Sequence, residues 1–331
     1  MKIDQIFKKI GLKKEEFDDL HITRNFSSFV AVSHGKVIAM TKPVISHCPL
    51  FSMLYKRGDS GMEETVEESI RRAVETKVKQ FGSFTERREL VRNDIAVPYG
   101  ASEMMMYGLR KGMLDAAVTV CDGAGSVIAS SPDLVQGIGA RMNGLFYTSP
   151  LPKVFQSITE AGGTVAFPET AAIDQVSALE KAVRAGYKKI AVTINGFTEE
   201  DIAQVKEIEK KYGIWAAAVI VCTTGVGSRR IEHIAAHADV VWSCASGPVR
   251  EVIGRKSILQ ITTGIPVFVL TQKGLEFVSA YCGEPGLLRE LDRSGQFLIS
   301  GYIKGRRIKM GTMTTYLSSA VLPVHSRKEP Y

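Results

Sequence analysis

The segments LDAAVTVCDGAGSV (114–127), IWAAAVIVCTTGVGS (214–228) and HADVVWSCASGPVRE (237–251) share one pattern. In each of them an apolar run is followed by a cysteine and then by small residues. The apolar runs do not alternate with polar residues, which is typical of strands that are buried on both faces of a parallel sheet. The three segments therefore indicate a parallel-sheet core with cysteines at the carboxyl ends of three strands.

Between residues 100 and 280, further apolar runs alternate with amphipathic helical stretches. Strands that are interleaved with helices of this length indicate βαβ units. We therefore predict an α/β protein with a mostly parallel sheet, helices on both faces of it, and small α+β additions at the N- and C-terminal ends. The predicted strands of the sheet are residues 116–121, 164–167, 189–194, 216–222, 239–244 and 266–270.

The pattern divides the chain into three regions. Residues 1–99 predict an N-terminal α+β region with an amphipathic first helix, a hairpin that turns at His34-Gly35 and a charged helix over 62–81. Residues 100–284 form the predicted α/β core. Residues 285–331 predict a basic hairpin followed by a loose tail.

Composition narrows the class of protein. The 331 residues are 45% apolar and 23% charged, which is a globular composition. The longest apolar runs are too short for a membrane span, and the first residues lack the apolar stretch of a signal peptide. The five scattered cysteines indicate a reducing compartment, so we expect a cytoplasmic protein with no membrane partner. The net charge of +7 reflects solvated helix faces or an anionic ligand, and no aromatic-interleaved basic stripe predicts nucleic-acid binding.

The strand-end residues Cys121, Cys222 and Cys244 are the first candidates for chemistry. Ligands of open parallel sheets bind outside the carboxyl ends of the strands, so three thiols at such ends are expected to face one crevice. Three thiolates can hold an iron–sulfur cluster that leaves one iron open, which makes these cysteines candidate metal ligands. The alternative for each cysteine is packing as a small buried hydrophobe.

Cys121 has another interpretation as a nucleophile or redox thiol. Asp122 beside it is then a candidate catalytic acid or base, and its structural alternative is to cap the following turn. Cys48 is a candidate fourth metal ligand from the N-terminal region. Cys282 is predicted to be structural.

Small residues near the strand ends and a glycine-rich stretch at 136–144 predict contacts with an acidic or phosphorylated small molecule. Glycines let backbone N–H groups approach an anion, and helix N-termini attract anions, so we expect the molecule near Arg141 and a helix beginning after Gly125. A plain glycine turn explains the stretch equally well, and Asp174 is either a helix N-cap or a ligand contact. The candidate ligand contacts are Gly123, Gly125, Gly137, Gly139, Arg141, Asp174, Thr223, Thr224, Gly225 and Ser246.

Several long motifs resemble one known family. They are CPLF (48–51), LDAAVTVCDGAGSVIASSPDLVQGIGAR (114–141), TAAIDQV (170–176), CTTG (222–225) and CAS (244–246). Together they resemble methanogenesis marker protein 8, a family of methanogenic archaea with relatives in anaerobic bacteria. The resemblance implies anaerobic one-carbon or methyl-transfer metabolism, including the making or maturing of a cofactor, and it assigns no catalytic residues.

Three hypotheses about function remain open at this point. The first is an enzyme or cofactor-maturation factor that uses a thiol-bound, iron–sulfur-type centre. The second is a non-catalytic accessory protein of a methyltransferase or corrinoid system. The third is an α/β enzyme that acts on an anionic small molecule and has structural cysteines. The expected partners are accordingly an anionic small molecule and either further copies of this chain or a methyl-transfer protein.

Overall fold

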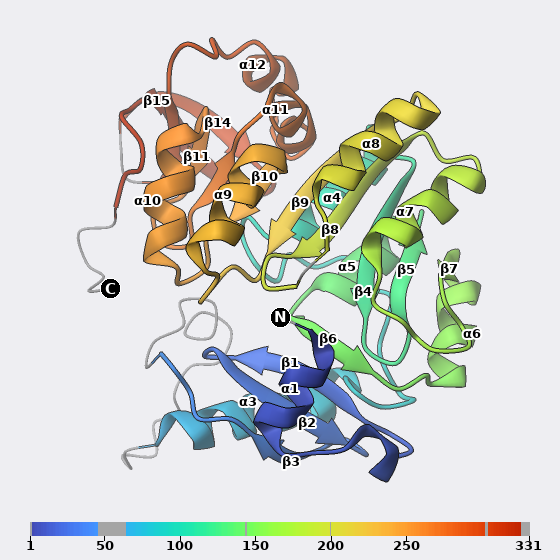
Figure 1. The fold of residues 1–331 in the computed structure, drawn as a ribbon. Coiled ribbons are helices and arrows are strands. Elements are labelled where there is room, and N and C mark those ends of the chain that lie inside the picture. The colour runs from blue at the N-terminus through green and yellow to red at the C-terminus, as the bar shows by residue number, and fades with distance from the viewer. Residues whose placement is uncertain (1, 46–63, 143, 199, 302–303, 326–331) are drawn as a thin grey trace.

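The computed structural model describes residues 2–45, 64–142, 144–198, 200–301 and 304–325, and these form two β-sheets with helices packed on them (Figure 1). The large sheet has eleven strands in the order β14-β15-β13-β11-β12-β10-β9-β8-β4-β5-β7. Its strands are β4 (Ala116–Cys121), β5 (Gly125–Ala129), β7 (Gly163–Val165), β8 (Lys189–Asn195), β9 (Trp215–Val221), β10 (Val240–Trp242), β11 (Leu259–Ile261), β12 (Val267–Val269), β13 (Phe297–Ser300), β14 (Arg306–Met310) and β15 (Met313–Ser319).

The predicted α/β class is confirmed, but the prediction of a mostly parallel sheet is wrong. Strands β4, β8, β9 and β10 pair in parallel, as does β11 with β13. The other neighbouring pairs of the large sheet are antiparallel, so the sheet is mixed. The error arose because a strand that is covered on both faces is apolar on both faces, whichever way its neighbours run.

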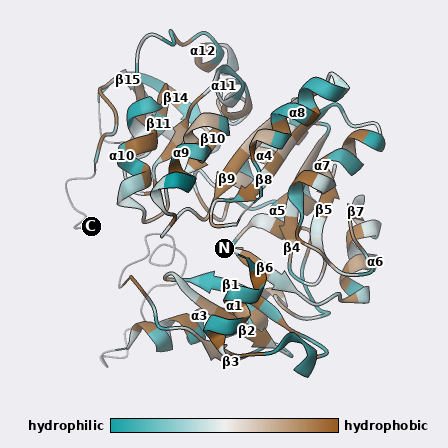
Figure 2. Ribbon diagram, viewed as in Figure 1, coloured by the Kyte–Doolittle hydropathy of each residue, from teal (hydrophilic) through white to brown (hydrophobic). Residues whose placement is uncertain are grey.

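Helices cover both faces of the large sheet, as predicted. Ala117, Ala191 and Val219 face a core shared with α4, α5 and α11, whereas Ile190 and Ala218 face a core shared with α7 to α10. Figure 2 shows hydrophobic residues along the strands of the large sheet and a mixture of hydrophobic and hydrophilic residues along the helices. These helices are α4 (Ala101–Arg110), α5 (Pro132–Gly139), α6 (Pro152–Glu160), α7 (Gln175–Arg184), α8 (Ala203–Tyr212), α9 (Ser228–His237), α10 (Gly247–Lys256), α11 (Gln272–Ser279) and α12 (Pro285–Arg289).

The N-terminal region forms a second layer. Its sheet has the order β3-β2-β1-β6, and the β2–β3 hairpin turns at His34-Gly35 as predicted. Val30 and Val32 pack on α3, whereas Phe29 and Ala31 belong to the core on the α1 side. The elements are α1 (Ile3–Ile10), the short 3₁₀ helix η1 (Lys14–Glu16), β1 (His21–Asn25), β2 (Ser28–Ser33), β3 (Lys36–Met40), α3 (Val66–Phe81) and β6 (Leu145–Thr148).

Two strand pairings cross the predicted region boundaries, which lie between residues 99 and 100 and between residues 284 and 285. Strand β6 comes from the core segment and pairs with β1 of the N-terminal sheet. Strand β13 pairs in parallel with β11, so the predicted basic hairpin extends the large sheet. None of the helices in the described ranges is long and apolar enough to cross a membrane.

Candidate functional site

A cavity of about 710 Å³ lies between the two sheets. Its walls come from β1 and the turn after it, from the start of α4, and from the carboxyl ends of β8, β9 and β10. Parallel strands of α/β sheets present ligands at this end, and the volume lies in the range of small-molecule sites. Apolar side chains that line the cavity include Val97, Met105, Val120, Leu145, Ile173 and Trp242.

Arg24 brings a positive charge into this cavity from β1. Its Nη1 donates a hydrogen bond to the carbonyl oxygen of Thr224 at 2.7 Å, and the ring of Phe197 lies over the guanidinium with its centroid 3.9 Å from Cζ. Burial lowers the pKa of Arg24, while the nearby thiols of Cys222 and Cys244 raise it. None of the described carboxylates forms an ion pair with Arg24, and its Nε is buried without a hydrogen-bond partner. A guanidinium that is desolvated and has no carboxylate partner favours the binding of an anion.

Glu200 is an acidic residue of the cavity wall whose pKa is strongly shifted. Its Oε1 accepts hydrogen bonds from the backbone N–H groups of Gln175 at 2.5 Å and Val176 at 3.3 Å, at the N-terminus of α7. Burial raises the pKa of Glu200 to about 7. The Asp174 carboxylate also raises the pKa, whereas the two N–H groups and the charge of Arg230 lower it. A carboxyl group that titrates near neutral pH is suited to give and take protons.

Some residues of the cavity wall also have buried polar atoms without hydrogen-bond partners among the described residues. The amide nitrogen of Asn195, the hydroxyl of Ser27 and the Nη1 atom of Arg141 can all donate hydrogen bonds. The side-chain oxygen of Gln175 can accept one, since its Nε2 already donates to the Thr193 carbonyl at 2.8 Å. Such atoms are costly unless a ligand or water satisfies them, and donors predominate here.

Two of the three strand-end cysteines, Cys222 and Cys244, line the cavity. Both adopt left-handed backbone conformations just after β9 and β10, with φ values of 59° and 49°. Burial raises the pKa of the Cys244 thiol, and the backbone N–H groups of Thr223 and Cys222 oppose this. Non-glycine residues rarely hold positive φ, and such residues gather at functional sites. Thr262, which follows β11 with φ 60°, lines the same cavity.

Cys121 does not join the other two thiols, so the expected three-cysteine centre is not formed. Strand β4 turns into the β4–β5 hairpin, in which Cys121 pairs with Gly125, and the helix expected after Gly125 is strand β5. Cys121 lies fully buried in the core, where burial and the neighbouring Asp122 carboxylate raise its thiol pKa well above the ordinary value. No group of three or more His, Cys, Asp or Glu side chains in the described ranges is arranged to hold a metal ion. Cys48 lies outside those ranges, and Cys282 is buried.

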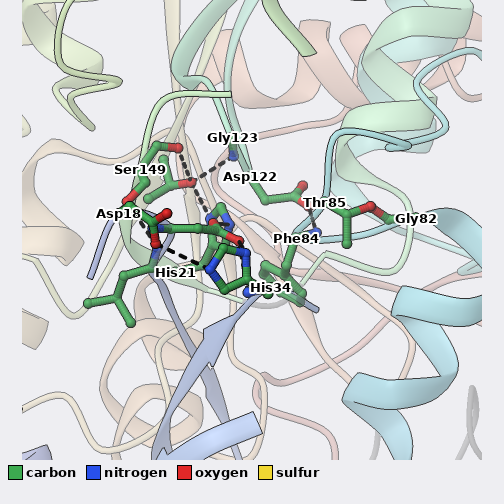
Figure 3. Close-up of polar contacts among 12 residues, drawn as sticks. Asp18, His21, His34, Gly82, Phe84, Thr85, Asp122, Gly123 and Ser149 are labelled. Atoms are coloured by element: carbon green, nitrogen blue, oxygen red, sulfur yellow. Dashed lines mark hydrogen bonds and ion pairs between the residues drawn. The ribbon is translucent and has the colours of Figure 1, made fainter. Parts of the chain in front are cut away.

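Asp122 also lies away from the cavity. Its Oδ1 accepts a hydrogen bond from Nε of the buried Arg88 at 2.9 Å. Its other oxygen accepts from the backbone N–H of Phe84 (Figure 3). Burial alone would raise the pKa of Asp122, but Arg88 and the Phe84 N–H group hold it below the ordinary value. Gly123 donates its N–H to Thr148, whose hydroxyl also contacts His21 at 2.6 Å. This buried network fastens the β4–β5 turn to the N-terminal layer.

The remaining predicted contacts divide into cavity residues and structural residues. Gly139, Arg141 and Thr224 line the cavity. Asp174 and Ser246 are helix N-caps that accept hydrogen bonds from the N–H groups of Ser177 and Val249. The structural residues, which are absent from the cavity wall, are Cys121, Asp122, Gly123, Gly125, Gly137, Asp174, Thr223, Gly225 and Ser246.

Arg24, Glu200 and Asn195 were missed as functional residues by sequence reasoning. The acidic residues that follow Thr198 resemble the first turn of a helix, whereas α8 begins at Ala203 and Glu200 instead reaches the N-terminus of α7. Arg24 is a lone cation in a strand with no local motif. Asn195 ends β8, so the same strand-end rule that indicated the cysteines could have identified it.

Comparisons with known proteins place the chain in a family. Residues 21–281 match the model of a family described as "Uncharacterized protein conserved in archaea (DUF2099)". The chain is also similar to an uncharacterized protein of Methanocaldococcus jannaschii, with 38% identity over 252 residues that cover 75% of this chain and 85% of that protein. The chain therefore belongs to this archaeal family.

Proposed function

We propose that this member of the archaeal family is an enzyme that binds an anionic small molecule at Arg24 and transfers a proton with Glu200. The observation that carries the proposal is the state of Arg24, because its guanidinium lines a large cavity and pairs with none of the described carboxylates. The Phe197 ring covers a face of the guanidinium, and its buried Nε lacks a partner. A carboxylate or phosphate group in the guanidinium plane would satisfy it.

Glu200 supplies the proton chemistry. Both hydrogen bonds that described residues donate to this carboxyl end on Oε1, which leaves Oε2 as the oxygen for proton exchange. An acidic C–H proton of the ligand would move to Oε2 and leave an enolate, whose charge the donors of the cavity stabilise. A proton returned from the same carboxyl restores both the ligand and Glu200. With a pKa of about 7, Glu200 provides both protonation states near neutral pH.

The cavity cysteines support a second candidate, thiol chemistry on the same ligand. Cys222 and Cys244 line the cavity beside Arg24, and a positive charge nearby favours the thiolate. The raised pKa of Cys244 argues against it as a ready nucleophile at neutral pH. We therefore place these thiols in the ligand site without a cluster shared with Cys121.

The metabolic setting is part of the proposal. The sequence motifs resemble methanogenesis marker protein 8, and the similar protein comes from Methanocaldococcus jannaschii. Both support a cytoplasmic role in anaerobic one-carbon or methyl-transfer metabolism, including cofactor synthesis. An accessory role beside a methyl-transfer protein is less well supported, because a binding module has no need of a carboxyl group tuned to neutral pH.

Proton transfer is tested by deuterium exchange. The protein would be incubated in D₂O with pyruvate, 2-oxoglutarate and dihydroxyacetone phosphate, and ¹H NMR would follow the C–H groups next to the carbonyl. We expect exchange above the uncatalysed rate with at least one acid, loss of exchange in Glu200→Gln, and weaker ligand binding in Arg24→Met. Arg255→Met, on the exposed surface of α10, is the matched control. Exchange that persists unchanged in Glu200→Gln would contradict the proposed chemistry.

A further inference from the structure

We infer that the ligand of this cavity is an aromatic acid, with its anionic group at Arg24 and an aromatic ring system against the apolar part of the wall. The inference rests on the proposed function and narrows its substrate class. Carboxylic acids and phosphate esters that carry aromatic rings have this chemistry. A small acid would bind at Arg24 alone and leave the apolar wall in contact with water.

The cavity is larger than a small acid requires. Its volume of about 710 Å³ lies in the upper part of the range of roughly 300–1,000 Å³ that is typical of sites for drug-sized ligands. A three-carbon acid such as pyruvate would leave most of this space to water. Apolar surface that stays hydrated contributes nothing to affinity, so the volume favours a ligand with a large apolar body.

The charged groups of the described wall provide for one anionic group. Four charged side chains line the described part of the cavity, and two of them are engaged by other parts of the chain. Glu103 accepts hydrogen bonds from two backbone N–H groups, at 3.1 and 2.9 Å. Arg141 donates to Asp94 at 3.1 Å. Arg24 and Glu200 are then the groups for the anion and for the proton.

Much of the remaining wall suits aromatic rings. Trp242 and Tyr99 are neighbours in it, because the indole Nε1 donates a hydrogen bond to the Tyr99 carbonyl at 2.8 Å. Met105 and Met313 line the same cavity. Aromatic rings attract one another, and thioether sulfurs attract ring edges, beyond the effect of buried area. An aromatic body therefore gains more from this wall than an alkyl chain does.

Met313 is the wall residue best placed to select the apolar body. It begins β15 and packs against the core that contains Trp242, whereas Arg24 is held by Thr224 and Phe197. The match to the archaeal family ends at residue 281, so this part of the wall lies outside the matched residues. A change at Met313 should therefore alter the choice of apolar body and leave the anion site unchanged.

The test is a calorimetric titration with acetate, phenylacetate and 2-naphthylacetate at pH 6, where Glu200 is mostly protonated and repels anions least. The three probes share the carboxylate and differ in the apolar body. We expect phenylacetate to bind about ten- to hundredfold more tightly than acetate, which is the factor for burying a phenyl group, and 2-naphthylacetate to bind more tightly still.

Variants separate the two parts of the site. Arg24→Met should weaken the binding of all three probes. Met313→Gln should weaken the binding of the two aromatic probes alone. Met113→Gln makes the same chemical change at a half-buried position outside the cavity wall and is the matched control. Circular dichroism of each variant would confirm that lost binding is not lost folding.

The two tryptophans of the chain report where the aromatic probe binds. Trp242 lines the cavity, whereas Trp215 begins β9 at the other end of that strand and donates its Nε1–H to Glu276 at 3.0 Å. In ¹H–¹⁵N correlation spectra, 2-naphthylacetate should shift the indole N–H signal of Trp242 and leave that of Trp215 in place. Trp215→Phe assigns the two signals.

Each outcome bears on a different claim. Equal affinities for acetate and the aromatic probes would overturn the inference and leave the anion site at Arg24 intact. An aromatic probe that shifts the signal of Trp215 and not that of Trp242 would also overturn it. Affinities that Arg24→Met leaves unchanged would overturn the anchor that the inference shares with the proposed function. Deuterium exchange of the small acids tests the proposed proton transfer independently of this series.

Discussion

Replacement of Glu200 by glutamine is expected to stabilise the protein at alkaline pH. Glutamine keeps the side-chain oxygen that accepts from the Gln175 and Val176 N–H groups, but it removes the charge that burial disfavours. The pKa of Glu200 rises from 4.5 to about 7 on folding. At 1.36 kcal/mol per pKa unit, this difference costs the folded state roughly 3 kcal/mol once the group is ionised.

The sign of the pH dependence follows from the raised pKa. Below pH 4.5 the carboxyl is protonated in both states and contributes nothing. Between pH 4.5 and 7 the unfolded chain loses the proton first, so stability falls as pH rises. Above pH 7 the full cost applies, and Glu200→Gln should then exceed the wild type by up to roughly 3 kcal/mol.

The assay is urea unfolding followed by circular dichroism at intervals from pH 4.5 to 8.5. The difference in unfolding free energy between variant and wild type cancels the titration of all other groups. Glu160→Gln makes the same chemical change at the exposed end of α6 and is the matched control. A flat difference for Glu200→Gln, or a wild type that is more stable at pH 8, would refute the reasoning.

Three further predictions concern two structural residues and one cysteine of the cavity wall. Asp122→Ala leaves the Arg88 guanidinium buried without its carboxylate, so thermal unfolding should show a loss of roughly 3–5 kcal/mol, without the pH dependence expected at Glu200. Gly137→Ala places a Cβ 1.9 Å from the carbonyl oxygen of Leu90, so chemical denaturation should show a loss of about 1–3 kcal/mol as α5 is pushed from that segment. Cys244 should react slowly with iodoacetamide at pH 7 and faster as pH rises, because burial raises its pKa, and mass spectrometry of labelled peptides would detect a contrary fast reaction.

Sequence reasoning located the strands well because their boundaries depend on local composition. The strand predicted at 116–121 is β4. The run predicted at 189–194 is one residue shorter than β8, and the run predicted at 216–222 differs from β9 by one residue at each end. Local composition did not predict the direction in which each strand runs. The antiparallel pairing of β12 with β10 depends on how the chain returns to the sheet, and an apolar run is the same in either direction.

The sequence indicated only those residues of the candidate site that follow a strand end, because the other contacts of the site are not local in the sequence. Cys222 and Cys244 both follow strands of the parallel centre, and both line the cavity at the strand ends. Cys121 has the same local sequence pattern, but Gly123 and Gly125 with positive φ turn its strand into a hairpin. Glu200 reaches the cavity through a contact with a different helix, and no local pattern records such a contact.

The central claim is that Arg24 binds an anion inside the cavity, and anomalous diffraction from a crystal soaked in selenate tests it most directly. Selenium scatters anomalously, and selenate is a tetrahedral dianion that an arginine can bind through two parallel hydrogen bonds. The account predicts a peak in hydrogen-bond contact with the Arg24 guanidinium, and no peak there in Arg24→Met crystals. Selenate bound elsewhere on the protein, with the Arg24 guanidinium left unoccupied in the wild type, would contradict it.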